Sequence, residues 1–454
     1  IMLDHRIFNE RPESQDRLIK FLERMGYEYV SRSEAEKKRG RLNKVLFEDE
    51  LARFLNKQNY TFKSREYLFT PDAITKAINA IEVPLLQGLM MASKEIYNFL
   101  RYGISIEQVI PVDGGEPFKQ SFDLSYIDYD NPSNNTWQVT EEFSVEKPNG
   151  EYARPDIVIL VNGIPLVVIE CKKSGVDVSE GVKQNCRNMM PDYIQQLFKF
   201  TQIVLAVNPN KVMYGTAGTT PEFFAEWKED NDTLDWQTEL CNKYLDGKAI
   251  IAQDRAIVSL LDKKRFLDII RYFILYDSNI KKICRHQQYF AVNKTIERID
   301  GKDSADSNGG VIWHTQGSGK SLTMVMLVKK LLGVKSLENP RFLVVTDRIN
   351  LDKQIRDNFA ATQMEPVRAA TGKGLKSLLR DSGNVIVTTL INKFDTAVRS
   401  KFVCADSSNM YVLIDEAHRS QYSSLYNYMV EVLPNATMIA FTGTPLIANK
   451  KKNT

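Results

Sequence analysis

A chain of 454 residues is longer than one hydrophobic core usually supports, so two or three domains are expected. Its 43% hydrophobic and 26% charged residues are ordinary for a globular protein and exclude an intrinsically disordered chain. The formal net charge of +3 gives no general electrostatic reason to propose nucleic-acid binding, so such a function has to be argued from individual sites.

The cysteines and the apolar stretches exclude two further classes of protein. The five cysteines are scattered, odd in number and never spaced as CxxC, which argues against a disulfide framework and against a zinc site. The longest apolar stretch, residues 157–169, is interrupted by Asn162, Gly163 and Pro165 and is too short to span a bilayer. We therefore expect a cytoplasmic protein that makes no membrane contact.

The first half of the chain predicts a mixed α/β domain, for which we take residues 1–248. Two apolar runs, residues 157–161 and 164–171, are joined by Asn162-Gly163, the dipeptide that most strongly predicts a hairpin turn. The other expected elements are helices over residues 12–25, 48–56, 70–99, 181–188 and 193–200 and strands within 118–143 and over 203–207.

The second half predicts a different architecture. Residues 249–282 carry apolar residues at helical spacing, so we take residues 249–284 as a helical connector. Short apolar strands then alternate with helices over residues 285–454, which predicts a parallel, doubly wound sheet. The expected strands are residues 311–314, 342–346, 385–389, 411–414 and 438–441.

Charged residues lie at the open end of the predicted hairpin. Asp156 precedes its first strand, and Glu170 and Lys172 share one face at the end of the second. Two carboxylates can hold Mg²⁺, which activates water, while a lysine stabilises negative charge on a scissile phosphate. Glu170 and Lys172 alone would favour a strand that simply emerges into solvent. The hairpin that joins them to Asp156 favours a catalytic site.

The register of the hairpin decides whether this site can form. A strict two-residue turn pairs Asp156 with Ile169 and so points Asp156 away from Glu170. We therefore expect an odd-length loop, or a β-bulge near the turn or near Asp156, that returns the two carboxylates to one face.

The segment WHTQGSGKS, residues 313–321, lies between an apolar strand and an amphipathic helix, as a phosphate-binding loop requires. Glycines allow such a loop to turn its amides towards phosphate at the helix N-terminus. Lys320 would neutralise the β- and γ-phosphates of ATP, and Ser321 would ligate Mg²⁺. His314 stands where the broad pattern has its first glycine. The expected nucleotide contacts in the loop are Gln316, Gly317, Ser318, Gly319, Lys320 and Ser321.

A second motif, Asp-Glu-Ala-His at residues 415–418, follows the apolar run 411–414. Asp415 can hold Mg²⁺, and Glu416 can act as the catalytic residue that polarises the attacking water. A buried strand that ends in two acids is costly unless a cation meets them. The two motifs in this order indicate hydrolysis of a nucleoside triphosphate.

These motifs resemble those of superfamily 2 helicases, the group with a DEAH box. The resemblance implies a RecA-like motor lobe in which Gln288, upstream of the loop, contacts adenine. Further matching segments are Thr346-Asp347-Arg348, Thr388-Thr389 and Thr442 to Pro445.

The charged residues of the hairpin, Asp156, Glu170 and Lys172, resemble the core of PD-(D/E)xK nucleases. That resemblance implies a catalytic, metal-dependent centre at Asp156, Glu170 and Lys172. Gln184 matches the accessory glutamine found on the following helix in related nucleases, whereas Asn188 stands where many of them carry tyrosine.

A nuclease of this type followed by such an ATPase, with WHTQGSGKS and DEAHRS, resembles the restriction subunit of type I restriction-modification enzymes. The resemblance covers essentially the whole chain. It implies a subunit that joins modification and specificity subunits, pulls double-stranded DNA using ATP and cuts it. It also implies a second motor lobe beyond residue 454, so we expect these residues alone to turn over little ATP.

Two other functions stay open. A helicase-nuclease of a single-chain restriction system or of DNA repair would share both sites, and methyltransferase motifs in the same protein would favour it. A non-enzymatic DNA-binding scaffold is disfavoured because the expected site residues are intact. These residues are Asp156, Glu170, Lys172, Lys320, Asp415 and Glu416.

Overall fold

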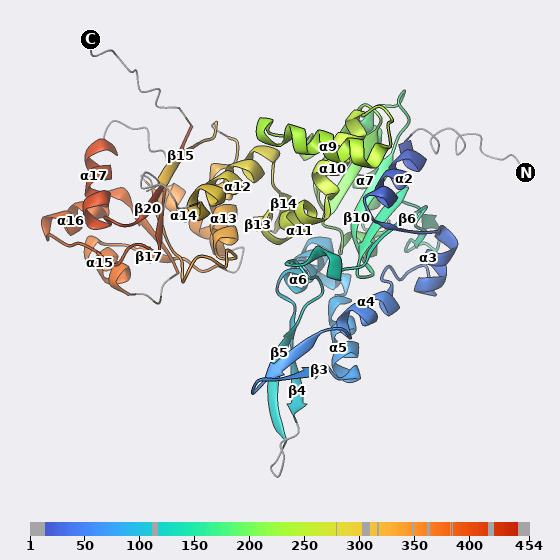
Figure 1. Cartoon of the computed structure of the whole chain (residues 1–454), viewed down its shortest axis with the longest axis horizontal. Coiled ribbons are helices and arrows are strands. Elements are labelled where there is room, and N and C mark those ends of the chain that lie inside the picture. Colours follow the sequence, from blue (N-terminus) through green and yellow to red (C-terminus); the bar gives the residue numbers. More distant parts are fainter. Residues whose placement is uncertain are drawn as a thin grey trace, which may run out of the picture. The chain divides into compact units, whose positions relative to one another are not determined.

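The computed structural model describes residues 14–443 except 111–116, 278, 302–308, 316, 347–348, 361–363, 382, 384 and 416–421. The chain divides into two compact units, residues 1–274 with 279–286 and residues 275–278 with 287–454 (Figure 1). None of the helices within the described ranges has the length and apolar character needed to cross a membrane.

The first unit is built on a mixed six-stranded sheet in the order β1-β6-β9-β10-β11-β12 (Figure 1). Its strands are β1 (Glu28–Val30), β6 (Trp137–Glu141), β9 (Ile157–Val161), β10 (Ile164–Cys171), β11 (Ile203–Asn208) and β12 (Lys211–Gly215). The pairs β1–β6 and β10–β11 are parallel and the other neighbours are antiparallel. Every residue of β9 and β10 is buried, which explains why these strands read as continuous apolar runs.

Helices cover this sheet, and α7 packs against β10 and β11. The helices of the unit are α2 (Asp16–Arg24), α3 (Arg32–Arg39), α4 (Glu48–Leu55), α5 (Pro71–Ile81), α6 (Leu89–Tyr102), α7 (Val178–Asn188), α8 (Gln195–Phe198), α9 (Leu234–Leu245), α10 (Ala252–Leu261) and α11 (Lys263–Tyr272). The expectation of continuous helix over residues 70–99 is wrong between Glu82 and Gly88. Pro84 is extended there and Gly88 has a φ of 85°, neither of which continues a helix.

The helical connector expected over residues 249–284 is also wrong in its last part. Helix ends at Tyr272, and two strands follow, β13 (Ile274–Asp277) and β14 (Ile280–Ile283). Asn279 between them adopts a φ of 64°, which a turn tolerates and a helix does not. The apolar residues that suggested helix are therefore shared between helix α11 and strand β13.

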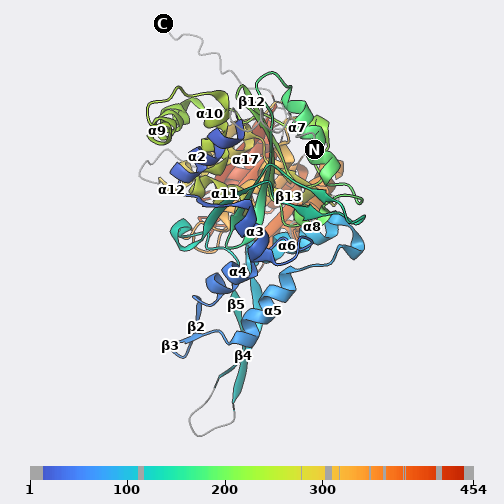
Figure 2. The ribbon, with the colours of Figure 1, turned by 90° about the vertical axis from the view of Figure 1, so that its right-hand side faces the viewer.

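Two antiparallel hairpins extend from the first unit away from its six-stranded sheet (Figure 2). They are formed by β2 (Asn59–Phe62) with β3 (Arg65–Leu68), and by β4 (Ile104–Ile110) with β5 (Phe118–Leu124). Stacking of Tyr60 on Phe122, with ring centroids 4.2 Å apart, joins the two hairpins. A third, short hairpin of β7 (Val145–Glu146) and β8 (Tyr152–Ala153) precedes β9.

The β9–β10 hairpin has the expected two-residue turn and the expected irregularity. Asn162 and Gly163 both have positive φ, 52° and 79°. The pairing shifts by one residue between Pro165 and Val167, somewhat further along the strand than expected. Beyond this bulge Ile169 pairs with Ile157, which brings the next positions, Glu170 and Asp156, opposite each other.

The turn itself is buried, which a hairpin turn seldom is. The Asn162 side chain donates to the Tyr126 carbonyl (3.0 Å) and to Asn135 Oδ1 (2.8 Å), and it accepts from the Thr136 amide (2.8 Å). The Gly163 carbonyl accepts from the Phe47 amide (2.9 Å). The strand register therefore depends on residues from two other segments as well as on the turn.

We expect Gly163→Ala to lower the free energy of unfolding by about 2–4 kcal/mol, because its Cβ would meet the Phe47 carbonyl oxygen at a positive φ. Gly150→Ala is the matched control, since Gly150 also has positive φ but open space around it. Urea unfolding of both variants checks this. Equal destabilisation would show that the close approach contributes nothing.

The second unit is built on a sheet that is parallel, as predicted, and has six strands in the order β15-β20-β19-β16-β18-β17. Its strands are β15 (Gly309–Trp313), β16 (Arg341–Thr346), β17 (Val367–Ala369), β18 (Ile386–Leu390), β19 (Met410–Asp415) and β20 (Thr437–Thr442). Its helices are α12 (His286–Asp300), α13 (Lys320–Leu331), α14 (Ile349–Ala360), α15 (Gly372–Arg380), α16 (Phe394–Arg399) and α17 (Tyr422–Val432). Only β17 was not expected from the sequence.

Candidate functional site

The bulge in the β9–β10 hairpin brings Asp156 and Glu170 together in the first unit. The Asp156 carboxylate accepts a hydrogen bond of 2.6 Å from the backbone N–H of Cys171, next to Glu170. The Asp156 carbonyl accepts from the Gln15 side chain on the segment leading into α2 (3.1 Å). Asp156 is therefore held at both its backbone and its side chain.

Helix α7 holds the other members of the group. Lys172 Nζ donates to Gln184 Oε1 (3.0 Å), and Asn188 Nδ2 donates to Glu170 Oε1 (3.3 Å). Gln184 and Asn188 are four residues apart and so lie on one helical face. Gly181 allows this close packing, because a Cβ there would lie 3.1 Å from Ala206 Cβ and 3.6 Å from Glu170 Cβ.

The two carboxyl groups are in an environment that disfavours their charge. Burial raises the pKa of Asp156 to about 6, despite opposing effects of the Cys171 amide and the Lys172 charge. Burial, and next the charge of Asp156, raise the pKa of Glu170 well above its usual value. Glu170 Oε2 is buried and receives no hydrogen bond from the described residues. A cation beside the pair would offset the burial of the two charges and their mutual repulsion, and it would give Glu170 Oε2 a partner.

The residues present therefore fit a divalent ion. Mg²⁺ is usually bound by one or two carboxylates and keeps several waters, so the pair Asp156 and Glu170 suffices as a protein contribution. Within the described parts of the chain, no cluster of three or more histidine, cysteine or acidic residues with metal-site geometry occurs.

The raised pKa values predict how stability depends on pH. Because both acids have higher pKa values when folded, these two groups bind more protons in the metal-free folded chain than in the unfolded chain. For Asp156, stability is lost as pH rises from about 4, its unfolded pKa, through about 6. At pH 8 without metal, Glu170→Gln should therefore raise the melting temperature, by about 2–4 °C per kcal/mol gained.

Mg²⁺ should show the opposite dependence. It needs the ionised pair, so it should raise the wild-type melting temperature at pH 8 and have little effect below about pH 5.5. Calorimetry with Mg²⁺ or with EDTA tests both statements. If Mg²⁺ raised the melting temperature of Glu170→Gln as much as that of the wild type, Glu170 would not be a metal ligand.

Two basic side chains, of which Arg187 acts electrostatically on Glu170, lie against one aromatic ring. Lys147 Nζ and the Arg187 guanidinium lie 5.1 and 5.4 Å from the centroid of the Tyr193 ring. Arg187 is exposed, and its charge acts to lower the pKa of Glu170, although burial outweighs it. Sequence reasoning missed this group, because its members come from three separate segments.

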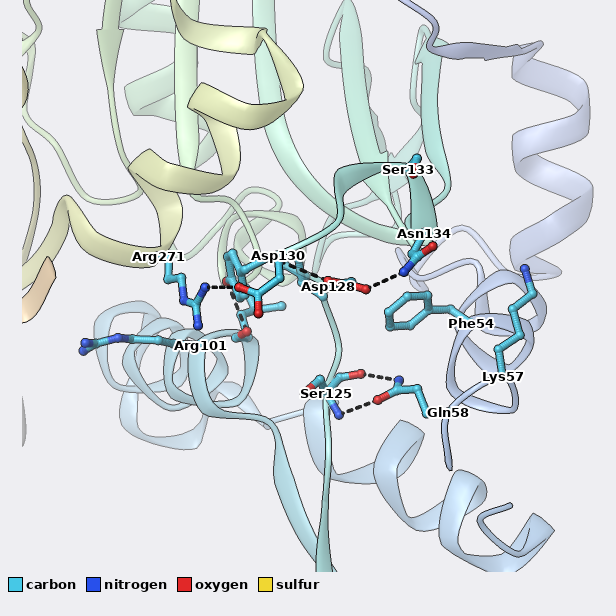
Figure 3. A pocket seen from close by; sticks show the side chains of 13 residues that line it. Phe54, Lys57, Gln58, Arg101, Ser125, Asp128, Asp130, Ser133, Asn134 and Arg271 are labelled. Carbon is cyan, nitrogen blue, oxygen red and sulfur yellow. Dashed lines mark hydrogen bonds and ion pairs between the residues drawn. The ribbon is translucent and has the colours of Figure 1, made fainter. Parts of the chain in front are cut away.

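A separate cleft of about 590 Å³ lies elsewhere in the first unit (Figure 3). It contains none of the hairpin acids, and its own acids already have partners. Asp130 pairs with Arg271 (2.9 Å) and Asp128 accepts from Asn134 (2.7 Å). We therefore regard this cleft as a structural feature of the fold.

The phosphate-loop sequence follows β15 in the second unit and leads into α13. Gly317 and Gly319 have φ values of 80° and 86°, a conformation that favours glycine. No side chain caps the N-terminus of α13, so its first amides are not covered by a capping residue. Lys320 and Ser321 occupy the first turn of this helix. Gln316 lies outside the described residues.

His314 and Gln288 pack against this loop. His314 Nδ1 lies 3.1 Å from Ser318 Oγ, and burial, followed by the charge of Lys320, lowers the pKa of His314. Gln288 Nε2 donates to the Gly319 carbonyl (3.2 Å). Histidine at the position of the usual first glycine is thus accommodated as a buried, neutral side chain.

Asp415 ends β19, the second neighbour of β15 in the parallel sheet, with β20 between them. The spacing of adjacent strands puts the ends of β15 and β19 about 10 Å apart at the same edge of the sheet. A nucleotide and its metal bridge such a distance, so the arrangement fits Mg²⁺ and ATP. Glu416, Asp347, Arg348 and Pro445 lie outside the described residues.

Comparison with known families divides the chain in the same order. Residues 7–223 match the type I restriction enzyme R protein N terminus, and residues 287–454 match the SWI2/SNF2 ATPase family.

Two similar proteins are endonuclease subunits by name. A putative type I restriction enzyme MjaIXP endonuclease subunit from Methanocaldococcus jannaschii is 29% identical, over 82% of this chain and 36% of that protein. The type I restriction enzyme HindI endonuclease subunit from Haemophilus influenzae is 28% identical, over 95% of this chain and 42% of that protein. The chain thus spans less than half the length of these relatives.

Among solved structures, the Sulfolobus solfataricus SWI2/SNF2 ATPase core in complex with dsDNA matches 39% of this chain and 34% of that chain, at 19% identity and a TM-score of 0.30. A score this low carries no weight for the fold, so the family is argued from the two family matches and from the similar endonuclease subunits. The chain thus carries a type I restriction enzyme R protein N-terminal domain over residues 7–223, followed by a SWI2/SNF2 ATPase domain over residues 287–454, and it is similar over most of its length to endonuclease subunits of type I restriction enzymes.

Proposed function

We propose that this chain carries the nuclease centre and the first motor lobe of a type I restriction subunit, which cleaves double-stranded DNA with Mg²⁺ and translocates it with ATP. The observation that carries the nuclease proposal is the convergence of Asp156, Glu170 and Lys172 at the open end of one hairpin. Their partners and burial fit a phosphodiesterase centre of the PD-(D/E)xK type. We divide the chain as residues 1–248, 249–284 and 285–454.

The nuclease residues have distinct roles in this proposal. Asp156 and Glu170 hold Mg²⁺, which when bound supplies an activated water and neutralises charge on the phosphate. Lys172 stabilises the additional negative charge that develops on the phosphate oxygens. Gln184 accepts a hydrogen bond from Lys172 Nζ (3.0 Å), and so it restrains the position of the ammonium group.

The ATPase residues act on charge in a similar way. The loop amides of residues 316–319 bind phosphate oxygens, and Lys320 neutralises the β- and γ-phosphates. Ser321 and Asp415 hold the Mg²⁺ of the nucleotide, Glu416 polarises the attacking water, and Gln288 contacts adenine. The lowered pKa of His314 keeps that side chain neutral beside Lys320, so it adds no charge to the loop.

Arg187 is proposed to bind the DNA backbone beside the cut site, because it is exposed and its charge acts on Glu170. Its contact with the Tyr193 ring limits the motion of its side chain, so less conformational entropy is lost on binding. Lys147, at the same ring, already pairs with Glu151 (3.0 Å) and is therefore the weaker candidate. Modification and specificity subunits are proposed as the protein partners, because both relatives are named as subunits. A single-chain helicase-nuclease finds no such support.

We expect Arg187→Gln to weaken duplex DNA binding and to lower the salt dependence of log K by about one unit of slope. Lys183→Gln is the control, because Lys183 lies on the same helix but pairs with Glu180 (2.7 Å). Binding should be titrated in EDTA at several salt concentrations. Equal slopes of log K against log salt concentration for the two variants would show that Arg187 does not contact the DNA backbone.

The whole proposal is tested by reconstitution. The full-length subunit should be combined with the proposed modification and specificity subunits, and DNA cleavage should be measured. Cleavage should require ATP, Mg²⁺ and all partners. Cleavage by the subunit alone would favour a single-chain enzyme, and no cleavage under any condition would overturn the nuclease assignment.

A further inference from the structure

Asn188 is the side chain on α7 that contacts the metal-binding pair directly. It is 2% exposed, and its Nδ2 donates to Glu170 Oε1 (3.3 Å). Gln184, one turn earlier, contacts Lys172 instead. One face of α7 therefore contacts both Glu170 and Lys172 of the hairpin.

Two buried acceptors remain at this contact. Glu170 Oε2 and Asn188 Oδ1 both lack a hydrogen-bond partner among the described residues. Buried polar atoms of this kind are uncommon and costly, so two on adjacent side chains need an explanation. A hydrated divalent ion supplies what each atom lacks, a positive charge for the carboxylate and water O–H donors for the amide oxygen.

We infer that Asn188 is a positioning residue of the metal site. Its Nδ2 fixes Glu170 Oε1 and leaves Glu170 Oε2 for the ion, while its Oδ1 accepts a hydrogen bond from a water of the hydrated ion. The inference rests on the proposed nuclease function. It assigns a role to the position at which this chain departs from the tyrosine of related nucleases.

The neighbouring Asn185 provides a matched control. It lies on the same helix, is completely buried, and also has an Oδ1 without a partner among the described residues. Its Nδ2 donates to the Leu205 carbonyl (2.9 Å) rather than to a carboxylate. Leucine is similar in size to asparagine, so this substitution at either position removes one buried amide from α7. Only Asn188→Leu removes a contact with Glu170.

The test is Mg²⁺ binding by the 454-residue chain, measured by calorimetric titration at pH 8. Asn188→Leu should weaken Mg²⁺ binding about 10–100-fold, the usual effect of losing a group that orients a metal ligand. Asn185→Leu should lower the melting temperature and leave the Mg²⁺ affinity unchanged. Asn188→Ser, which keeps a small donor and acceptor, should recover part of the affinity and serves if the leucine variant does not fold.

Asp156→Asn separates the possible failures. Suppose that Asp156→Asn abolishes Mg²⁺ binding. The role of Asn188 is then overturned if Asn188→Leu leaves the Mg²⁺ affinity unchanged, or if Asn185→Leu weakens it equally. If Asp156→Asn binds Mg²⁺ as tightly as the wild type, the proposed metal site itself is wrong.

Discussion

Replacing Asp156 by alanine is expected to abolish DNA strand cleavage by the full-length assembly and to leave DNA-stimulated ATP hydrolysis unchanged. The loss should exceed about 10²-fold, since even groups that only orient a metal ligand contribute 10–100-fold. Asp156 and Glu170 form the only carboxylate pair that we assign to the nuclease, so one acid alone would hold Mg²⁺ poorly. Lys172→Ala should have the same effect, because charge on the phosphate oxygens would lose its cation.

The control for this experiment is Asp235→Ala, which removes an exposed acid on α9 in the same unit. Cleavage of a plasmid that carries recognition sites and release of inorganic phosphate should be followed in one reaction. Normal cleavage by Asp156→Ala would reject the nuclease centre. Loss of ATP hydrolysis in both Asp156→Ala and Lys172→Ala would contradict the assignment of the two activities to separate sites.

Replacing Lys320 by alanine is expected to remove ATP hydrolysis and, with it, DNA translocation and cleavage. Lys320 begins α13 directly after the phosphate loop, and it is the loop cation that we assign to the β- and γ-phosphates. Removal of a cation that stabilises phosphoryl-transfer charge costs about 10³-fold or more in rate. A motor that does not move cannot bring the nuclease to its cutting position.

Lys373→Ala, at an exposed position in α15, is the control for a lost surface charge. Phosphate release, triplex displacement as a measure of translocation, and plasmid cleavage should be compared in the full-length assembly. Cleavage at the normal rate by Lys320→Ala would mean that the nuclease is not gated by the motor.

Local sequence signals were sufficient for the central strands of both sheets. In the first unit they did not predict the outer strands β1 and β12, helices α3 and α9, or strands β2, β3, β4, β7 and β8. The parallel sheet of the second unit was predicted because each strand is a short apolar run bounded by helix, and five of its six strands were found this way. The sixth, β17, is three residues long and carries no such run. Residues 70–99 and 274–283 were misassigned because apolar spacing over a few residues suits a helix and a buried strand equally well.

By itself the sequence determined the chemistry that is available to this protein. Two sets of residues can be recognised from local patterns alone: Asp156, Glu170 and Lys172 at the ends of a hairpin, and the GSGKS and DEAH segments after apolar strands. The grouping of Asp156, Glu170 and Lys172 on one hairpin follows from the Asn162-Gly163 turn. The family follows from the order of the two sets along the chain.

Only the tertiary structure decided whether those residues meet. A one-residue shift between Pro165 and Val167 turns Asp156 towards Glu170, and a bulge of this kind depends on the neighbouring strands and on the segments that bury the turn. The same holds for Asn188, for the Lys147, Tyr193 and Arg187 group, and for the burial that raises the pKa of both acids. Register, burial and contacts between distant segments depend on how the whole unit packs, so no local pattern of residues could have specified them.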